Sequence, residues 1–242
     1  MRYSVHLSLL RQQLRKLGVI YFDHTPITKL CPTRNQVYYE AGARVITYDR
    51  CIIATGAWTN QLLRASNLPP IPYRISLEQI NMFKVPPGKT PPHNISGEYQ
   101  GNFCYMYPPI TSQHLHTDYI KVVVHTHPTI DVTIPEPSTQ KHVTDTRLLQ
   151  IARGFFRNYV TPVDVPVETL RCPYTYRDDG TGDDFMVGPI PGHNNIIAMV
   201  GFRGEGYKFS PTVSKLVLLL ATGTKLTRLP DWWQELSRQF SY

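Results

Sequence analysis

The feature that most constrains the fold is an apolar strand that leads through a short loop into a helix, in the segment NNIIAMVGFRGEGYKFSPTVSKLVLLL. Residues 196–200 predict a buried strand, and residues 211–221 predict a helix. Ser210 is the expected N-cap and Pro211 the expected first helical residue. A strand followed directly by a helix is typical of an α/β layer, so at least this part of the chain should build one.

The loop between that strand and that helix is rich in glycine, with Gly201, Gly204 and Gly206. Free backbone N–H groups and the positive end of the helix dipole would face whatever occupies the loop, which favours an electron-rich or anionic ligand. The glycine spacing matches neither a dinucleotide GxGxxG nor a phosphate P-loop. An ordinary glycine-rich turn with a solvated Lys208 is the alternative.

A second strand and glycine turn occurs earlier, in DRCIIATGAWT. Residues 51–54 predict a buried strand, and Ala54, Thr55 and Gly56 follow at its carboxyl end. This is the edge of a sheet where α/β folds bind ligands, and a glycine there lets a ligand approach the backbone. A turn with a purely structural role is the alternative.

Two further segments carry reactive side chains. In RCPYTYRDDG, Cys172 is either a packed small hydrophobe or a thiolate whose pKa is lowered by Arg171, and Tyr174 shares its side of a strand. In YIKVVVH, Lys121 and His125 stand four residues apart and should point to the same face of a strand. Lys121 could instead protect an edge strand from aggregation.

The remaining pattern predicts a mixed α/β fold (α+β) with an antiparallel sheet in its middle. An amphipathic helix opens the chain, and one or two helical turns are expected at 60–65 and a longer helix at 144–159. Further strands are expected at 19–22, 27–30, 36–40, 43–47, 75–85, 103–107, 119–125, 165–171 and 185–187. Changes in this pattern divide the chain into residues 1–72, 73–164 and 165–242.

Composition excludes several classes of protein. The 242 residues are 41% hydrophobic, enough for a self-sustaining core, and no apolar run reaches the length of a membrane span. The net charge is +7, but the basic residues are scattered, so nucleic-acid binding is not expected. The four cysteines form no CxxC pair and no metal-ligand spacing, which favours a reducing compartment and predicts neither a disulfide framework nor a metal site.

Taken together and in this order, the segments ATGAW, KVVVH, CPYT and GFRGEGYKF give the chain a family likeness. It resembles the monomeric sarcosine oxidase and N-methyl amino acid oxidase family of FAD-dependent amine oxidases, whose relatives include fructosyl amino acid, pipecolate and saccharopine oxidases. The likeness extends from the first helix to about Gly223. It implies a Rossmann-like FAD-binding domain built from residues 1–72 and 165–242, with residues 73–164 inserted as an antiparallel substrate domain.

The resemblance also implies a reaction. The flavin takes a hydride equivalent from the carbon next to nitrogen in a secondary amine or N-methyl amino acid. Water hydrolyses the resulting imine, and O2 reoxidises the flavin to give H2O2. The particular amine stays open.

Roles for individual residues follow from the same resemblance. It implies a thioether from Cys172 to FAD, a substrate carboxylate held by Lys208, and O2 activation by Lys121. His125 and Tyr174 would line the same site. The resemblance also implies that the backbone near Ile27 contacts the adenine end of FAD. Ala54, Thr55 and Gly56 would contact the flavin, and so would the loop of Gly201, Gly204 and Gly206.

The sequence departs from the family pattern in two ways. The GxGxxG segment that seats the pyrophosphate in the family is absent, so the Rossmann-like domain is expected to be incomplete and a second polypeptide to supply that segment. The loop carries Arg203 and Glu205 where relatives have small residues, and an Arg203–Glu205 ion pair is the simplest way to neutralise the acid.

These departures keep a second hypothesis open, a truncated, non-catalytic remnant that binds no FAD alone. We expect an intracellular protein, cytoplasmic or peroxisomal, although the ending DWWQELSRQFSY has no SKL-like signal.

Overall fold

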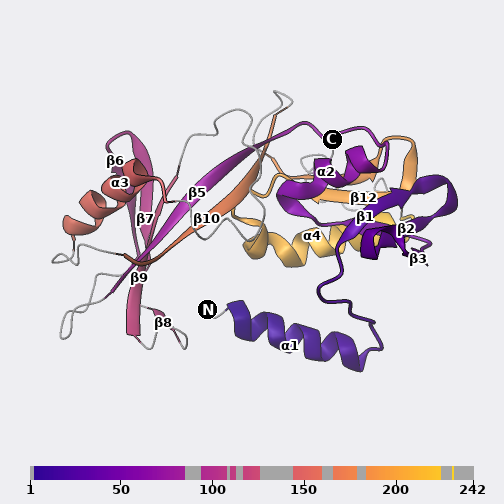
Figure 1. Cartoon of the computed structure of the whole chain (residues 1–242), viewed down its shortest axis with the longest axis horizontal. Helices are drawn as coiled ribbons and strands as arrows, with labels where there is room; N and C mark the ends of the chain where they lie inside the picture. The colour runs from indigo at the N-terminus through magenta and orange to yellow at the C-terminus, as the bar shows by residue number, and fades with distance from the viewer. Residues whose placement is uncertain are drawn as a thin grey trace.

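The computed structural model describes residues 3–84, 94–107, 110–112, 117–125, 144–159, 166–178, 184–224 and 231. It confirms the mixed α/β class. A large antiparallel sheet with one helix forms one end of the molecule, two smaller sheets with their helices form the other, and two long strands run between them (Figure 1). None of the helices in these ranges is long and apolar enough to cross a membrane.

The large sheet has the strand order β10-β5-β9-β7-β6, with β8 paired to β9. The strands are β5 (Tyr73–Lys84), β6 (Ile95–Tyr99), β7 (Asn102–Met106), β8 (Ile110–Ser112), β9 (Thr117–Val124) and β10 (Pro166–Arg177). Neither β6 nor β8 was expected from the sequence. β10 pairs with β5 along its whole length, so residues 166–177 belong to this sheet.

β10 is longer than the strand predicted to end at Arg171, and Cys172 therefore lies inside a strand and not beside its end. β10 instead continues through Pro173. β10 is an edge strand in the described part of the sheet, where one side of the backbone has no ladder partner and proline is tolerated.

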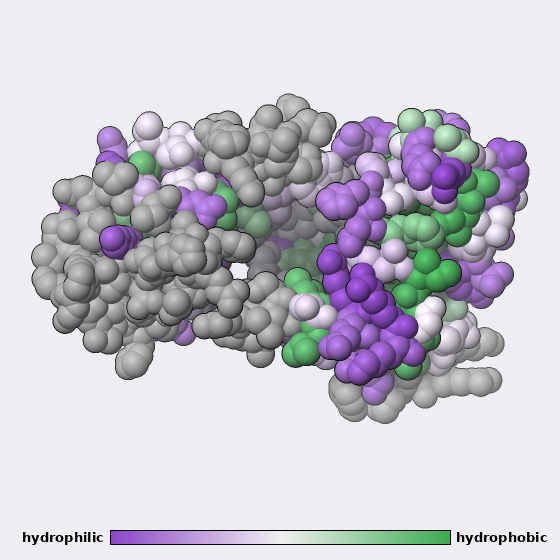
Figure 2. All heavy atoms as spheres, turned by 60° about the horizontal axis from the view of Figure 1, so that its bottom comes forward, coloured by the Kyte–Doolittle hydropathy of each residue, from purple (hydrophilic) through white to green (hydrophobic). Residues whose placement is uncertain are grey.

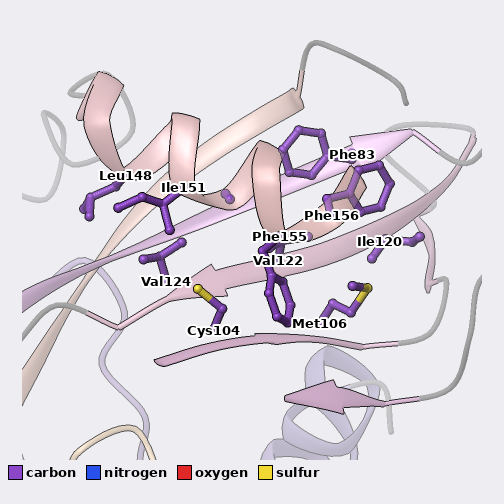
Figure 3. Packing of buried hydrophobic residues seen from close by; sticks show 11 residues of the cluster. Phe83, Cys104, Met106, Ile120, Val122, Val124, Leu148, Ile151, Phe155 and Phe156 are labelled. Atoms are coloured by element: carbon purple, nitrogen blue, oxygen red, sulfur yellow. The ribbon is translucent and has the colours of Figure 1, made fainter. Parts of the chain in front are cut away.

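One face of the large sheet is covered by α3 (Thr146–Arg157), whose N-cap Asp145 accepts hydrogen bonds from the backbone N–H groups of Arg147 and Leu148. Side chains from α3 point onto β5, β7 and β9 in Figure 3. Phe156 stacks on Phe83 with the ring centroids 4.8 Å apart. Alternate residues of these same strands must point away from α3, so the opposite face is free to carry other chemistry.

The second part contains a sheet with the order β11-β12-β4, formed by β4 (Cys51–Ile53), β11 (Met186–Ile190) and β12 (His193–Val200). β12 runs parallel to β4, with Ala198 opposite Ile53. One face packs on α4 (Gly206–Ala221), and the other packs with α2 (Thr59–Ala65) and β1 (Ile27–Cys31). The short helix η3 (Gly56–Trp58) joins β4 to α2.

The helix α4 begins at Gly206, five residues before the predicted start, so the prediction of Ser210 as N-cap and Pro211 as first residue was wrong. Pro211 is an interior residue and cannot donate to the carbonyl of Tyr207, four residues earlier. The Ser210 hydroxyl donates to that carbonyl instead, at 2.9 Å. This replacement bond explains how the helix continues through a proline.

The third sheet is antiparallel, with β1 next to β2 (Gln36–Tyr39) and β2 next to β3 (Arg44–Thr47). The short helices η1 (Pro32–Arg34) and η2 (Glu40–Gly42) lie between its strands. The N-terminal helix is confirmed as α1 (Tyr3–Lys16), but the strand predicted at 19–22 is not formed.

The side chains of α1 and of the segment after it are largely exposed. The exposed fractions are 53% at Leu9 and 78% at Ile20, so the apolar pattern that predicted a helix and a strand here does not reflect burial. Figure 2 shows the side of the molecule to which α1 belongs, where strongly hydrophilic residues and exposed hydrophobic residues lie next to one another.

Candidate active site

A cavity of about 620 Å³ lies between the open face of the large sheet and the loop that precedes α4. Its wall is rich in aromatic residues: Phe103, Tyr105, Tyr107, Tyr174, Tyr176 and Tyr207. The polar lining includes His125, Arg203, Glu205 and Lys208. Four predicted site residues, His125, Tyr174, Gly204 and Lys208, are thus brought together, although they come from three different segments.

His125 lies at the centre of the aromatic wall. Its ring centroid is 5.3 Å from that of Tyr105, 5.7 Å from that of Phe103 and 5.9 Å from that of Tyr174. The Nδ1 atom of His125 lies 3.4 Å from Oε2 of Glu78. Burial lowers the pKa of His125, and the Glu78 charge opposes that effect. The imidazole is therefore expected to be neutral at physiological pH.

Glu78 is a functional candidate that the sequence analysis missed. Its side chain is fully buried, and its Oε1 accepts hydrogen bonds from the hydroxyls of Ser76 and of Tyr176, the latter at 3.3 Å. The signal was available, because a single acid interrupts the strand sequence YRISLEQINMFK. A buried carboxylate in a strand is costly and needs partners, so it marks a position with a specific role.

Lys121 lies on β9 between β5 and β7, so it does not protect an edge strand, and that alternative is excluded. Lys121 and His125 share one face of β9, as predicted, because Val122 and Val124 point into the core under α3. Burial lowers the pKa of Lys121. Its ammonium lies 5.8 Å from the centre of the Tyr107 ring.

Cys172 faces the same side of the sheet, opposite Glu78 on the neighbouring strand. Burial raises the pKa of its thiol, and the positive charge of Lys121 works against that rise. Arg171 does not activate Cys172 as was supposed, because adjacent residues of a strand point to opposite faces. The Arg171 guanidinium instead donates to Oε1 of Gln79 at 3.4 Å.

Tyr105 and Tyr174 lie close together in the wall, and each affects the pKa of the other. Burial raises the pKa of Tyr174 to about 12 and also raises the pKa of Tyr105. Both phenols therefore keep their protons at physiological pH. A protonated Tyr174 can donate its O–H to a bound ligand.

The glycine loop is tied to β10 by the backbone. The Gly201 N–H donates to the Thr175 hydroxyl at 2.9 Å, and the Arg203 N–H donates to the Thr175 carbonyl at 3.1 Å. Gly204 lies so close to Tyr174 that a Cβ atom there would come within 2.3 Å of the ring. Glycine is needed at this position to let the loop close over the sheet face.

The charged residues of this loop form a small network. The Lys208 ammonium lies 2.7 Å from Oε1 of Glu205, and the Arg203 guanidinium lies 3.7 Å from Oε2 of the same side chain. The predicted Arg203–Glu205 pair is present, but Lys208 is the closer partner. Lys208 keeps 66% of its side chain exposed, so it is accessible to a ligand.

The other predicted cofactor contacts lie in the second part of the molecule. Because β4 and β12 are parallel, the Ala54–Gly56 turn and the Gly201–Gly206 loop follow them at the same sheet edge. Open space surrounds the Cβ position of Gly56, whose φ is +55°, so a flat group could approach that backbone closely. Ile27 lies in the separate β1-β2-β3 sheet and is 41% exposed.

In the described part of the chain, eight predicted site residues do not line the cavity. They are Ile27, Ala54, Thr55, Gly56, Lys121, Cys172, Gly201 and Gly206. The predicted site residues therefore form two groups, one in the aromatic cavity and one beside it on the sheet face and at the parallel sheet edge. Residues 179–183, between β10 and β11, lie outside the described residues.

Residues 4–219 match the model of the DAO family, described as FAD dependent oxidoreductase. The chain belongs to this family.

Two curated relatives are sarcosine oxidases. The monomeric sarcosine oxidase of Streptomyces avermitilis is 28% identical over 91% of this chain and 56% of its own length. The peroxisomal sarcosine oxidase of Homo sapiens is 24% identical over 89% of this chain and 54% of its own length. The chain thus spans about half the length of these relatives.

Solved structures agree in fold. NikD, an unusual amino acid oxidase essential for nikkomycin biosynthesis, superimposes with a TM-score of 0.64 at 18% identity, over 90% of this chain and 54% of its own. An Amadoriase I mutant from Aspergillus fumigatus gives a TM-score of 0.67 at 16% identity, over 93% of this chain and 51% of its own.

Proposed function

We propose that this chain carries the flavin-facing and substrate-facing walls of an amine oxidase. The reaction is oxidation of the C–N bond of a secondary amine or N-methyl amino acid with O2 as acceptor, which gives an imine and H2O2. The observation that carries the proposal is the convergence of Lys121, His125, Cys172 and Tyr174 on one sheet face, with Lys208 across the cavity.

The residues present fit the isoalloxazine end of FAD. When bound, FAD supplies the two-electron acceptor for the amine and returns those electrons to O2. Cys172 would hold it through a thioether, and the open space in front of Gly56 leaves room for a flat ring against the backbone. The positive charge of Lys121 favours the thiolate form of Cys172 against the effect of burial.

Lys208 and the aromatic wall would orient the substrate. A carboxylate entering the cavity competes with Glu205 for the Lys208 ammonium, and the exposure of Lys208 permits the exchange. Tyr174 can donate its O–H to the same ligand. Fixing the carboxylate at one end of the cavity directs the carbon beside nitrogen toward the sheet face.

Lys121 would serve O2 reduction. Negative charge builds on O2 as it gains electrons, and a fixed ammonium in a partly buried position stabilises that charge more than water does. The lowered pKa of Lys121 means that this ammonium is easier to deprotonate than an exposed lysine. O2 reduction should therefore weaken at alkaline pH as Lys121 loses its proton.

The agreement of side chains from several segments on one site favours an enzyme over a non-catalytic remnant. The nucleotide end of FAD requires a GxGxxG segment that these 242 residues do not contain. We propose that such a segment, for instance on a partner polypeptide, completes the site. A cytoplasmic or peroxisomal location remains a prediction.

The test is H2O2 release by the protein, purified together with any polypeptide that completes its FAD site and supplied with FAD, screened against sarcosine, N-methyl amino acids, pipecolate and fructosyl amino acids. One of these classes should give H2O2 in proportion to O2 consumed. Lys208→Met should raise KM for a carboxylate substrate, whereas Lys215→Met, on α4 and outside the cavity lining, should not. Full turnover by Lys208→Met with unchanged KM would contradict the assignment.

A further inference from the structure

None of the roles proposed for the amine oxidation involves the buried carboxylate of Glu78. Its two oxygens have different surroundings. Oε1 receives hydrogen bonds from Ser76 and Tyr176, and Oε2 lies 3.4 Å from Nδ1 of His125. Two hydroxyls therefore hold the carboxylate in one orientation, and that orientation aims the second oxygen at the histidine.

The charged and titratable groups around His125 come from every element that surrounds it. β5 brings Glu78, β7 brings Tyr105, β10 brings Tyr174, and the loop before α4 brings Glu205. Lys121, on the strand of His125 itself, opposes protonation, whereas the two carboxylates favour it. Of these two acids, Glu78 is the one that is fully buried and in ion-pair contact with the ring.

We propose that Glu78 is a positioning residue that fixes the tautomer of His125, with the proton on Nδ1 and the lone pair of Nε2 available to the cavity. A carboxylate can only accept a hydrogen bond, so the ring nitrogen that faces Glu78 must carry a proton. Neutral imidazole has one N–H, which leaves Nε2 as an acceptor. Because His125 lines the cavity, Nε2 is the nitrogen that can meet a ligand there.

This inference rests on the proposed amine oxidation for its consequence. A secondary amine binds mostly as its ammonium form, and it must lose a proton before the neighbouring carbon can give up a hydride. Nε2 of His125 can take that proton, and Glu78 then stabilises the imidazolium that results. The proton passes from the substrate nitrogen to Nε2, and no oxidant or reductant is involved in this step.

The first test needs neither flavin nor turnover. Long-range ¹H–¹⁵N NMR spectra of the whole protein labelled with ¹⁵N-histidine distinguish the two neutral tautomers, and the signals that His125→Asn removes identify His125. We expect the Nδ1–H form at a pH where the ring is neutral. A neutral His125 in the Nε2–H form would overturn the inference and leave the proposed function untouched.

The second test is Glu78→Gln. Ser76 and Tyr176 would hold the amide carbonyl in the place of Oε1, so the NH2 group would face Nδ1 and donate to it. His125 should therefore switch to the Nε2–H tautomer, and its pKa should fall by about one unit because the buried negative charge is gone. Glu205→Gln is the matched control, since it removes a more exposed acid and should keep the tautomer. No switch in Glu78→Gln would contradict the proposal.

Activity measurements distinguish a positioning role of Glu78 from a merely structural one. In an active preparation, Glu78→Gln should lower kcat by about 100-fold, the usual contribution of a general base, and move the acid limb of the pH profile to lower pH. The KM for a carboxylate substrate should change little. A fall in activity with the limb unmoved would indicate a structural role. Failure of wild-type turnover would count against the proposed function only, because the NMR results stand without it.

Discussion

The two faces of the large sheet are built from the same strands and differ in almost every other respect. The face under α3 is packed with residues such as Phe83, Val122 and Phe156 and contains one continuous core (Figure 3). The opposite face carries Glu78, Lys121 and Cys172, and burial shifts the pKa values of Lys121 and Cys172. Strand alternation alone can therefore separate the residues that stabilise this sheet from those proposed to react.

The largest stability effect should come from the α3 face. Phe156→Ala removes a ring that is 1% exposed and stacked on Phe83, so the free energy of unfolding should fall by about 3–5 kcal/mol. Tyr107→Phe on the opposite face, where the side chain is 42% exposed, should change it by less than about 0.5 kcal/mol. Urea denaturation measures both, and equal losses would show that the faces are not specialised.

A smaller effect on stability should come from the loop that closes over the reactive face, which is the face of the large sheet with Glu78, Lys121 and Cys172. Gly204→Ala places a methyl group 2.3 Å from the Tyr174 ring at a φ of +78°, and should cost about 2–3 kcal/mol and narrow the cavity. Gly192→Ala is the matched control, because its φ is +80° but open space surrounds its Cβ position. It should cost only about 1 kcal/mol. Thermal unfolding of the two variants separates crowding from backbone strain, and equal losses would mean that Tyr174 moves freely.

The smallest stability effect should come from the exposed charges of that loop. Glu205→Gln breaks an ion pair in which Lys208 is 66% exposed, so the free energy of unfolding should change by less than about 1 kcal/mol. The same change frees Lys208 and should lower KM for a carboxylate substrate. Steady-state kinetics beside a denaturation curve checks both, and a raised KM would show that Glu205 helps to hold the substrate.

The sequence predicted the reactive face better than it predicted the ends of its strands. Spacing of two along β10 and of four along β9 correctly placed Tyr174 with Cys172 and His125 with Lys121, since alternation is a local property of a strand. The length of β10 and the start of α4 were wrong, because both depend on how proline is accommodated. An edge position tolerates Pro173, and the Ser210 hydroxyl compensates for Pro211.

Other features depend on tertiary contacts that no local pattern contains. Arg171 is adjacent to Cys172 in sequence, yet it serves the other face of the sheet through Gln79. The apolar residues of α1 and of 19–22 predicted burial by their pattern, and they are largely exposed.

We propose that the sheet face with Glu78, Lys121 and Cys172 holds the flavin through Cys172. The decisive experiment is mass spectrometry of the whole protein after acid denaturation, followed by peptide mapping, with Cys172→Ser and Cys51→Ser as the paired variants. We expect one flavin on the peptide that contains Cys172, lost in Cys172→Ser and kept in Cys51→Ser. Flavin attached to another residue, or retained through denaturation by Cys172→Ser, would contradict it.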